Sequence, residues 1–142
     1  VFDEAQETSI YADDDATVGI ALNGDIYRAQ QSNPALHYIY PKGKLLIWID
    51  TMAITKDAPH KENAYKFLNY IMQPNVAARI ARFAMFSTPN TAARKLLPVK
   101  ERYSTVLYPP ASRLEYAEVE SHLTLKTKQQ LGKYWEHLKL SS

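Results

Sequence analysis

The segment that most constrains the fold is Lys44–Ile54, an apolar run interrupted by a single carboxylate. Leu45 to Ile49 has the composition of a strand buried on both faces, and Asp50 follows it directly. A buried carboxylate is costly unless a cation or several hydrogen-bond donors meet it. One interpretation is a pocket for a cationic group, in which Asp50 supplies the charge and the Trp48 ring the surface for a carbon chain. The other is that Asp50 caps a turn and Trp48 belongs to the core.

The composition is that of a globular chain. Its 142 residues are enough for one domain with a core. Its formal charge of +2 and its scattered Lys and Arg residues give no indication of nucleic-acid binding. No apolar run approaches the ~20 residues that span a bilayer. Cysteine is absent, which excludes disulfides, thiolate metal ligands and cysteine nucleophiles.

Known catalytic and metal-binding motifs are missing from the sequence. It contains no G-x-S-x-G, no G-x-G-x-x-G and no P-loop. The four histidines are far apart and show no metal-ligand spacing. Glu118 and Glu120 are closely spaced carboxylates, but no partner base can be placed beside them. We therefore predict that the protein is not an enzyme and uses neither a cofactor nor a metal.

The first third of the chain is predicted to alternate strands with a helix. Thr17 to Leu22 indicates a short buried strand, and residues 23–25 an Asn-Gly-Asp turn that caps a helix running to about Gln31. Such an order places backbone N–H groups at the carboxyl end of a strand, a common ligand-facing position in α/β sheets. A further brief strand is predicted from His37 to Pro41.

The rest of the chain is predicted to be mainly helical. Apolar residues at helical spacing indicate helices over 61–72, 74–84 and 124–138. Asn90 follows a Ser-Thr-Pro sequence and is expected to cap a short helix over 91–97. The last helix carries a tryptophan on its apolar face, which we expect in the core or at a docking surface. Strands alternating with helices indicate an α/β class.

Four segments of the sequence carry a resemblance to a known family. They are VGIALNGD at 18–25, WIDTMAI at 48–54, NAYKFLNYIMQP at 63–74, and STPN with AARKLL at 87–97. In this order and spacing they resemble the C-terminal half of the bacterial spermidine/putrescine-binding proteins, over about residues 10–140. One such motif is weakly specific, whereas four in order are fairly specific for the polyamine-type extracellular solute-binding family.

This resemblance implies an α/β fold of the type II periplasmic-binding-protein kind, incomplete here because the N-terminal half would be missing. Two lobes would close on a polyamine, with residues 1–47 and 97–142 in the C-terminal lobe and the hinge strand and helices of 48–96 in the N-terminal lobe. The implied location is the periplasm and the implied partner the membrane permease of an ABC importer. The chain has no initiator Met and no signal peptide, so we expect either a removed leader or a piece of something longer.

The resemblance also implies the residues of a ligand site. Trp48 would stack on the methylenes of the ligand, and Asp50 would pair with an ammonium group. Leu22 stands where a tryptophan is usual, and Phe86 where a tyrosine is usual. From the residues alone, Phe86 either closes over a pocket or packs in the core. A further polar contact is expected near residues 116–121, where the candidates are Glu118, Glu120 and Ser121.

Three hypotheses follow. The first is a polyamine-binding module of an importer, and the second is a binder of a different small solute on the same fold. The third is a non-binding fragment that is stable only through self-association. The helices over 61–72 and 74–84 would leave their apolar stripes uncovered, so the chain is predicted to form a dimer by exchanging residues 50–96 between two copies.

Overall fold

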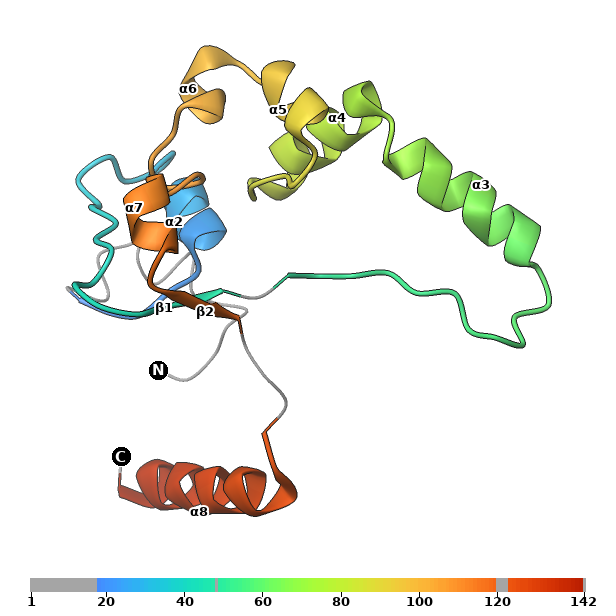
Figure 1. Ribbon diagram of the computed structural model, residues 1–142. Helices are drawn as coiled ribbons and strands as arrows, with labels where there is room; N and C mark the ends of the chain where they lie inside the picture. Colours follow the sequence, from blue (N-terminus) through green and yellow to red (C-terminus); the bar gives the residue numbers. More distant parts are fainter. Residues whose placement is uncertain (1–17, 48, 120–122, 142) are drawn as a thin grey trace.

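The computed structural model describes residues 18–47, 49–119 and 123–141 (Figure 1). Its elements, in chain order, are α2 (Asn23–Ala29), β1 (Leu45–Ile47), α3 (Lys61–Ile71), α4 (Pro74–Ala84), α5 (Thr91–Lys95), α6 (Val99–Arg102), α7 (Ala111–Leu114), β2 (Ala117–Val119) and α8 (Leu125–Ser141). Helices α3 to α7 lie between the two strands in the sequence, and β1 and β2 pair in parallel. The predicted α/β class is therefore confirmed.

The elements are spread out in space rather than gathered around one centre. From residue 49 the chain runs extended as far as residue 55 and then turns before the start of α3, and α3 projects away from α4 (Figure 1). At the other end of the chain, α8 stands apart from the remaining helices (Figure 1). Within the described residues, no helix combines the length and the apolar character needed to cross a bilayer.

The strand at the centre of the sequence prediction is shorter and more exposed than expected. β1 covers Leu45 to Ile47 and pairs with β2 in the register Leu45 with Ala117 and Ile47 with Val119. Leu46, Ile49 and Asp50 are exposed, so the prediction of a strand buried on both faces is wrong for this chain. A doubly buried strand needs a covering layer on each face, and a two-stranded ribbon does not supply it.

Two further predicted strands are not formed. Residues 18–22 and 37–41 have no strand structure, although they are apolar. Val18, Ile20 and Ile39 are all exposed. An apolar run becomes a strand only where a neighbouring strand accepts its backbone hydrogen bonds, and this requirement cannot be read from the run itself. Thr17 lies outside the described residues.

The two long helices in the middle of the chain are confirmed. α3 begins at Lys61 as predicted and ends one residue earlier than predicted, and α4 has the predicted bounds, with proline in its first turn. α4 buries Val76, Ala78 and Ala81, whereas α3 buries none of its residues. Phe83, near the end of α4, is 90% exposed. Both helices thus keep apolar side chains in contact with solvent.

A small cluster of buried residues lies where α4 meets α5. It consists of Ala78, Ala81, Ala93 and Leu97, with Tyr108 packed against it. The guanidinium of Arg94 lies 3.8 Å from the centre of the Tyr108 ring, a cation–π contact that covers one side of this cluster. Three of the four buried residues in this cluster are alanines, so α4 and α5 approach each other closely but bury little apolar area.

The predicted cap at the start of α5 is confirmed. The Asn90 side-chain oxygen accepts a hydrogen bond from the backbone N–H of Ala93, at 3.0 Å. The Asn90 side-chain nitrogen also donates to the carbonyl oxygen of Met72, at 2.9 Å. One side chain therefore satisfies a free N–H at the start of α5 and a free carbonyl at the end of α3.

Replacing Asn90 with Ala is expected to destabilise α5 by about 1 kcal/mol, because both hydrogen bonds are lost. The measurement is hydrogen exchange at the Ala93 amide, which should become faster. The Asn90→Asp variant is the control, since it keeps the acceptor for the Ala93 amide and should retain most of the protection. Equal protection in the Ala variant and the parent would contradict this role.

The last helix also differs in detail from its prediction. It covers Leu125 to Ser141 instead of 124–138, and the Thr124 hydroxyl oxygen accepts a hydrogen bond from the Thr127 amide at its start. Trp135 is 42% exposed, so of its two expected places the core is excluded in this structure, and the docking surface stays a prediction.

Candidate functional site

The structure brings two of the predicted site residues to one place. Leu22 is the residue immediately before α2, and Gly24 is buried in its first turn. Phe86 packs its ring on Gly24 so closely that a methyl group at this position would stand 2.6 Å from two ring carbons. Leu22 and Phe86 are both half-buried. Residues from distant parts of the sequence thus form one apolar surface beside the start of α2.

The start of α2 is held by a hydrogen-bond cluster. The sequence predicted that Asn23 caps the helix, but Asn23 is its first helical residue and makes no cap. Its side-chain nitrogen instead donates to the carbonyls of Val106, at 3.0 Å, and Leu107, at 3.3 Å. The Tyr40 hydroxyl donates to the same Val106 carbonyl, at 2.8 Å. The prediction that residues 23–25 form a turn capping the helix is therefore wrong, because all three belong to α2 and the Asn23 amide makes a long-range contact instead.

The Tyr40 hydroxyl stays protonated at neutral pH. Burial raises the pKa of Tyr40 to about 12, and the neighbouring Tyr38 adds to this, while a hydrogen bond with Asn23 opposes it. The rings of Tyr38 and Tyr40 meet edge to face, with centres 4.9 Å apart. Tyr40 is therefore a permanent donor that fixes the 106–107 backbone beneath α2, not a group for acid–base chemistry.

The segment that carries Phe86 is fixed by contacts on both sides of it. The Arg28 guanidinium, on α2, donates to the Ala84 carbonyl at 2.8 Å. Met85 follows, with a φ of 58°, and ends α4 in the left-handed conformation. The backbone amide of Thr88 donates to the Tyr108 hydroxyl, at 3.2 Å. The path of the chain from Ala84 to Thr88 is thus set by two other segments.

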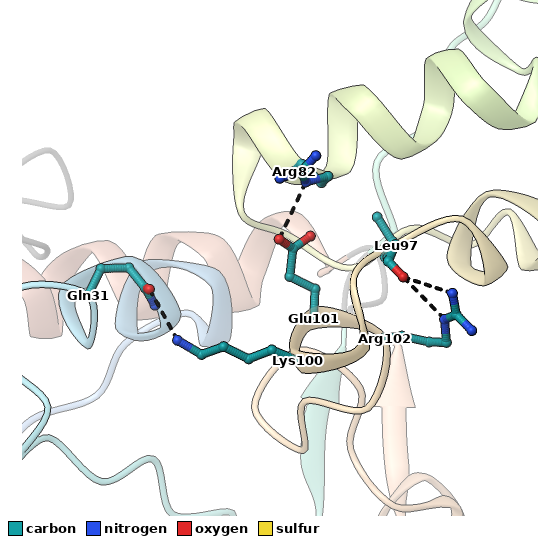
Figure 2. A network of polar contacts seen from close by, with 6 residues as sticks. All are labelled: Gln31, Arg82, Leu97, Lys100, Glu101 and Arg102. Atoms are coloured by element: carbon teal, nitrogen blue, oxygen red, sulfur yellow. Dashed lines mark hydrogen bonds and ion pairs between the residues drawn. The ribbon is translucent and has the colours of Figure 1, made fainter.

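A polar network links α4, α6 and the residues that follow α2 (Figure 2). Arg82 of α4 forms an ion pair with Glu101 of α6, at 3.4 Å, and Lys100 of α6 donates to Gln31 after α2, at 3.4 Å. Because these groups are exposed or only partly covered, an individual pair of this kind contributes about 0–1 kcal/mol. The network ties the end of α4 to the end of α2, which keeps Phe86 near Gly24.

The predicted charge contact lies in a different setting from the one expected. Asp50 is exposed in the extended segment after β1, and no hydrogen bond or ion pair of Asp50 is found within the described part of the chain. Trp48 lies outside the described residues. The structure therefore does not join Asp50 to the surface that Leu22 and Phe86 form.

Of the three polar candidates near residue 120, the structure describes one. Glu118 is the middle residue of β2 and forms an ion pair with Lys44, next to β1. Both side chains are largely exposed, so this pair links the two strands without a buried charge. Glu120 and Ser121 lie outside the described residues. A role for Glu118 in ligand binding would require it to leave Lys44.

Metal binding has no support in the geometry. Within residues 18–47, 49–119 and 123–141, no three His, Asp or Glu side chains gather as metal ligands would. What the described residues offer is an apolar surface at Leu22 and Phe86 and, apart from it, the exposed carboxylates of Asp50 and Glu118. This chemistry suits non-covalent binding of a small molecule with apolar and charged parts.

Comparison with known proteins identifies the family. The model of the family described as bacterial extracellular solute-binding protein matches residues 3–107. The spermidine/putrescine-binding periplasmic proteins of Salmonella typhimurium and Escherichia coli are 32% identical to this chain over 117 residues, which are 82% of this chain and 34% of theirs. The norspermidine sensor of Vibrio cholerae is 30% identical over 115 residues, 80% of this chain and 32% of its own length.

Solved structures agree on the fold. A putative spermidine/putrescine ABC transporter protein from Listeria monocytogenes superposes with a TM-score of 0.85 at 27% identity, covering 96% of this chain and 42% of that one. The corresponding substrate-binding protein of Streptococcus pneumoniae, at 24% identity and a TM-score of 0.82, shows the same fold. The fold is thus part of a type II periplasmic binding protein, and the chain spans about a third of the length of the curated relatives it matches. This chain belongs to the bacterial extracellular solute-binding protein family.

Proposed function

We propose that this chain supplies part of a polyamine-binding site in the solute-binding component of an ABC importer. The observation that carries the proposal is the contact of Phe86 with Gly24 beside Leu22. This contact places Phe86 near Leu22 at the start of α2. The family resemblance assigns both positions to the ligand site. The names of the curated relatives, which bind spermidine, putrescine or norspermidine, support polyamines as the ligand class. The proposed location is the periplasm and the proposed partner an ABC permease.

The proposed mechanism is closure of two lobes on the ligand. Residues 1–47 and 97–142 would belong to one lobe, and residues 48–96 to the other. In the closed form Asp50 would pair with an ammonium group while Trp48 and Phe86 cover the methylenes, whose carbons next to nitrogen carry partial positive charge. Closure removes water and so strengthens the ion pair between Asp50 and the amine.

The test is a chimera in which this chain replaces the matched third of the Salmonella typhimurium relative. Calorimetry with putrescine and spermidine is expected to show binding, and glycine betaine is expected to show none. A folded chimera that binds no polyamine would contradict the proposal. Binding of glycine betaine in place of polyamine would favour a second candidate, a different solute on the same fold, for which the absence of an indole at Leu22 and of a hydroxyl at Phe86 is the supporting observation.

In this chimera Trp48 is expected to provide packing, so Trp48→Phe should weaken polyamine binding less than Trp48→Ala. A phenyl ring keeps part of the stacking surface, and a methyl group removes it. In a Trp135→Phe background, saturating polyamine should change the emission of Trp48. Unchanged emission together with normal affinity would show that the ligand does not contact this ring.

The exposed faces of α3 and α4 support a proposal about assembly. A shallow surface between these helices is lined by Tyr70, Ile71, Val76, Arg79, Ile80, Arg82 and Phe83. Exposing a few hundred Å² of apolar surface costs several kcal/mol, at about 25 cal/mol per Å². We propose that two copies of the 142-residue chain exchange residues 50–96 and so cover these faces.

Size-exclusion chromatography with light scattering over a dilution series is expected to show about twice the 16.2 kDa mass of one chain. Phe83→Ser should shift the equilibrium toward the monomer, because it removes an exposed phenyl ring from the proposed interface. Ile39→Ser is the matched control, since Ile39 is also exposed but lies outside the exchanged segment. A compact monomer at every concentration would rule out the exchange.

A further inference from the structure

We propose that Gly24, Arg28 and Met85 are positioning residues that fix the Phe86 ring as one wall of the ligand site. The inference rests on the proposed function in one respect, the role of Phe86 as a ligand contact. The placement of the ring itself stands on geometry alone. Each of the three residues controls a different part of the path that leads from α4 to Phe86.

Gly24 provides the space that the ring occupies. A methyl group added at Gly24 would stand 2.6–2.7 Å from three carbons of the Phe86 ring, a distance at which one of the groups must move. Gly24 is in helical conformation and needs no unusual backbone angle, so its lack of a side chain serves the contact and not the turn. Any larger residue at this position would push the ring away from α2.

Met85 provides the change of direction. With φ 58° and ψ 30°, it lies in the left-handed region that residues with a side chain rarely adopt, and where glycine or asparagine is the usual choice. Such a conformation persists only where the surrounding contacts determine it. Here it ends α4 and turns the chain, so that Phe86 leaves the helix and reaches Gly24.

Arg28 joins the two elements. Its guanidinium donates to the Ala84 carbonyl at 2.8 Å, a group left free because α4 ends at this residue. Asp25, one turn earlier on α2, lies 3.7 Å from the other guanidinium nitrogen and helps to orient it. α2 therefore holds both the residue before Met85, through Arg28, and the residue after it, through Gly24.

The positioning is tested first by NMR on the 142-residue chain. A proton above an aromatic ring is shielded, so the Gly24 α-protons are expected to resonate upfield of the Gly132 α-protons. Gly132 is the matched control, because nothing lies within 4 Å of the place where its Cβ would stand. In Phe86→Leu the upfield shift should disappear while Gly132 is unchanged. Absence of the shift in the parent chain would overturn the inference.

The link to binding is tested by calorimetry of the chimera with putrescine and spermidine, and the chimera that carries the unchanged sequence of this chain is the parent. Gly24→Ala is expected to weaken binding about tenfold in the parent and less than about twofold in the Phe86→Leu background, since the added methyl then meets no ring. Gly132→Ala should leave binding unchanged. Equal losses in both backgrounds would overturn the inference. If this parent chimera binds neither amine, the proposed function loses support, and the α-proton shift of the 142-residue chain alone decides the positioning.

Discussion

Asp50→Asn is expected to weaken polyamine binding by the chimera by roughly 2–5 kcal/mol, the effect of removing one partner of a desolvated charge pair. This corresponds to a loss of affinity between about thirtyfold and several thousandfold. Asp50 is exposed in the described structure, so its charge has no desolvation cost before ligand binding. The predicted effect arises only when closure buries the carboxylate together with an ammonium group.

Asp57→Asn is the matched control for this experiment. Asp57 is an exposed carboxylate in the same connection between β1 and α3, and removing its charge changes the long-range potential by the same amount. The loss of polyamine affinity in Asp57→Asn should be small and should vanish at high salt, because distant exposed charges are screened. If Asp50→Asn behaves like Asp57→Asn in calorimetry, Asp50 is a turn residue and not a ligand contact.

Leu97→Ala is expected to destabilise the chain by about 2–4 kcal/mol, because it leaves a cavity in the cluster formed with Ala78, Ala81 and Ala93. Leu97 is 3% exposed and is the largest aliphatic side chain of this cluster. The cluster has few other contacts that could compensate. The measurement is urea denaturation monitored by circular dichroism. The urea concentration at the midpoint should fall, while the dependence of the unfolding free energy on urea concentration should stay the same.

The neighbouring leucine gives the control. Leu96 is 58% exposed, so Leu96→Ala should change stability by no more than about 0.5 kcal/mol. The two variants remove the same atoms from adjacent positions and differ in burial. Similar denaturation midpoints for both variants would mean that the α4–α5 cluster does not support the fold.

Local signals explain which elements the sequence predicted well. The bounds of α4 and the cap of α5 follow from Pro74 and Asn90, because a proline in the first helical turn and an asparagine at the cap act within a few residues. The apolar spacing of α3 is equally local. By contrast, an apolar run such as residues 18–22 predicts a strand only if partner strands exist elsewhere, and in the described structure this run does not form a strand.

The candidate site was predictable only in part, for the same reason. The sequence and its family resemblance selected Leu22 and Phe86. Nothing local to either residue indicates that the Phe86 ring packs directly on Gly24. The hydrogen bonds of Asn23 to the 106–107 backbone are also long-range, and they reversed the expected capping role of this residue. The ion pair of Glu118 with Lys44 across the two strands is likewise a long-range contact that neither residue indicates locally.

The pairing of β1 with β2 has a consequence for the order of folding. Leu45 and Ala117 are partners, so forming the first bridge closes a loop of about 70 residues. By the logarithmic dependence of closure entropy on length, this costs roughly 2.5 kcal/mol more than closing a four-residue hairpin. Two strands of three residues recover little of that cost, and we expect them to join after α4 and α5 have packed and shortened the effective loop. This ribbon would then be the last part of the chain to assemble and the first to open, an order of events that time-resolved hydrogen exchange at Leu46 and Ala93 would reveal.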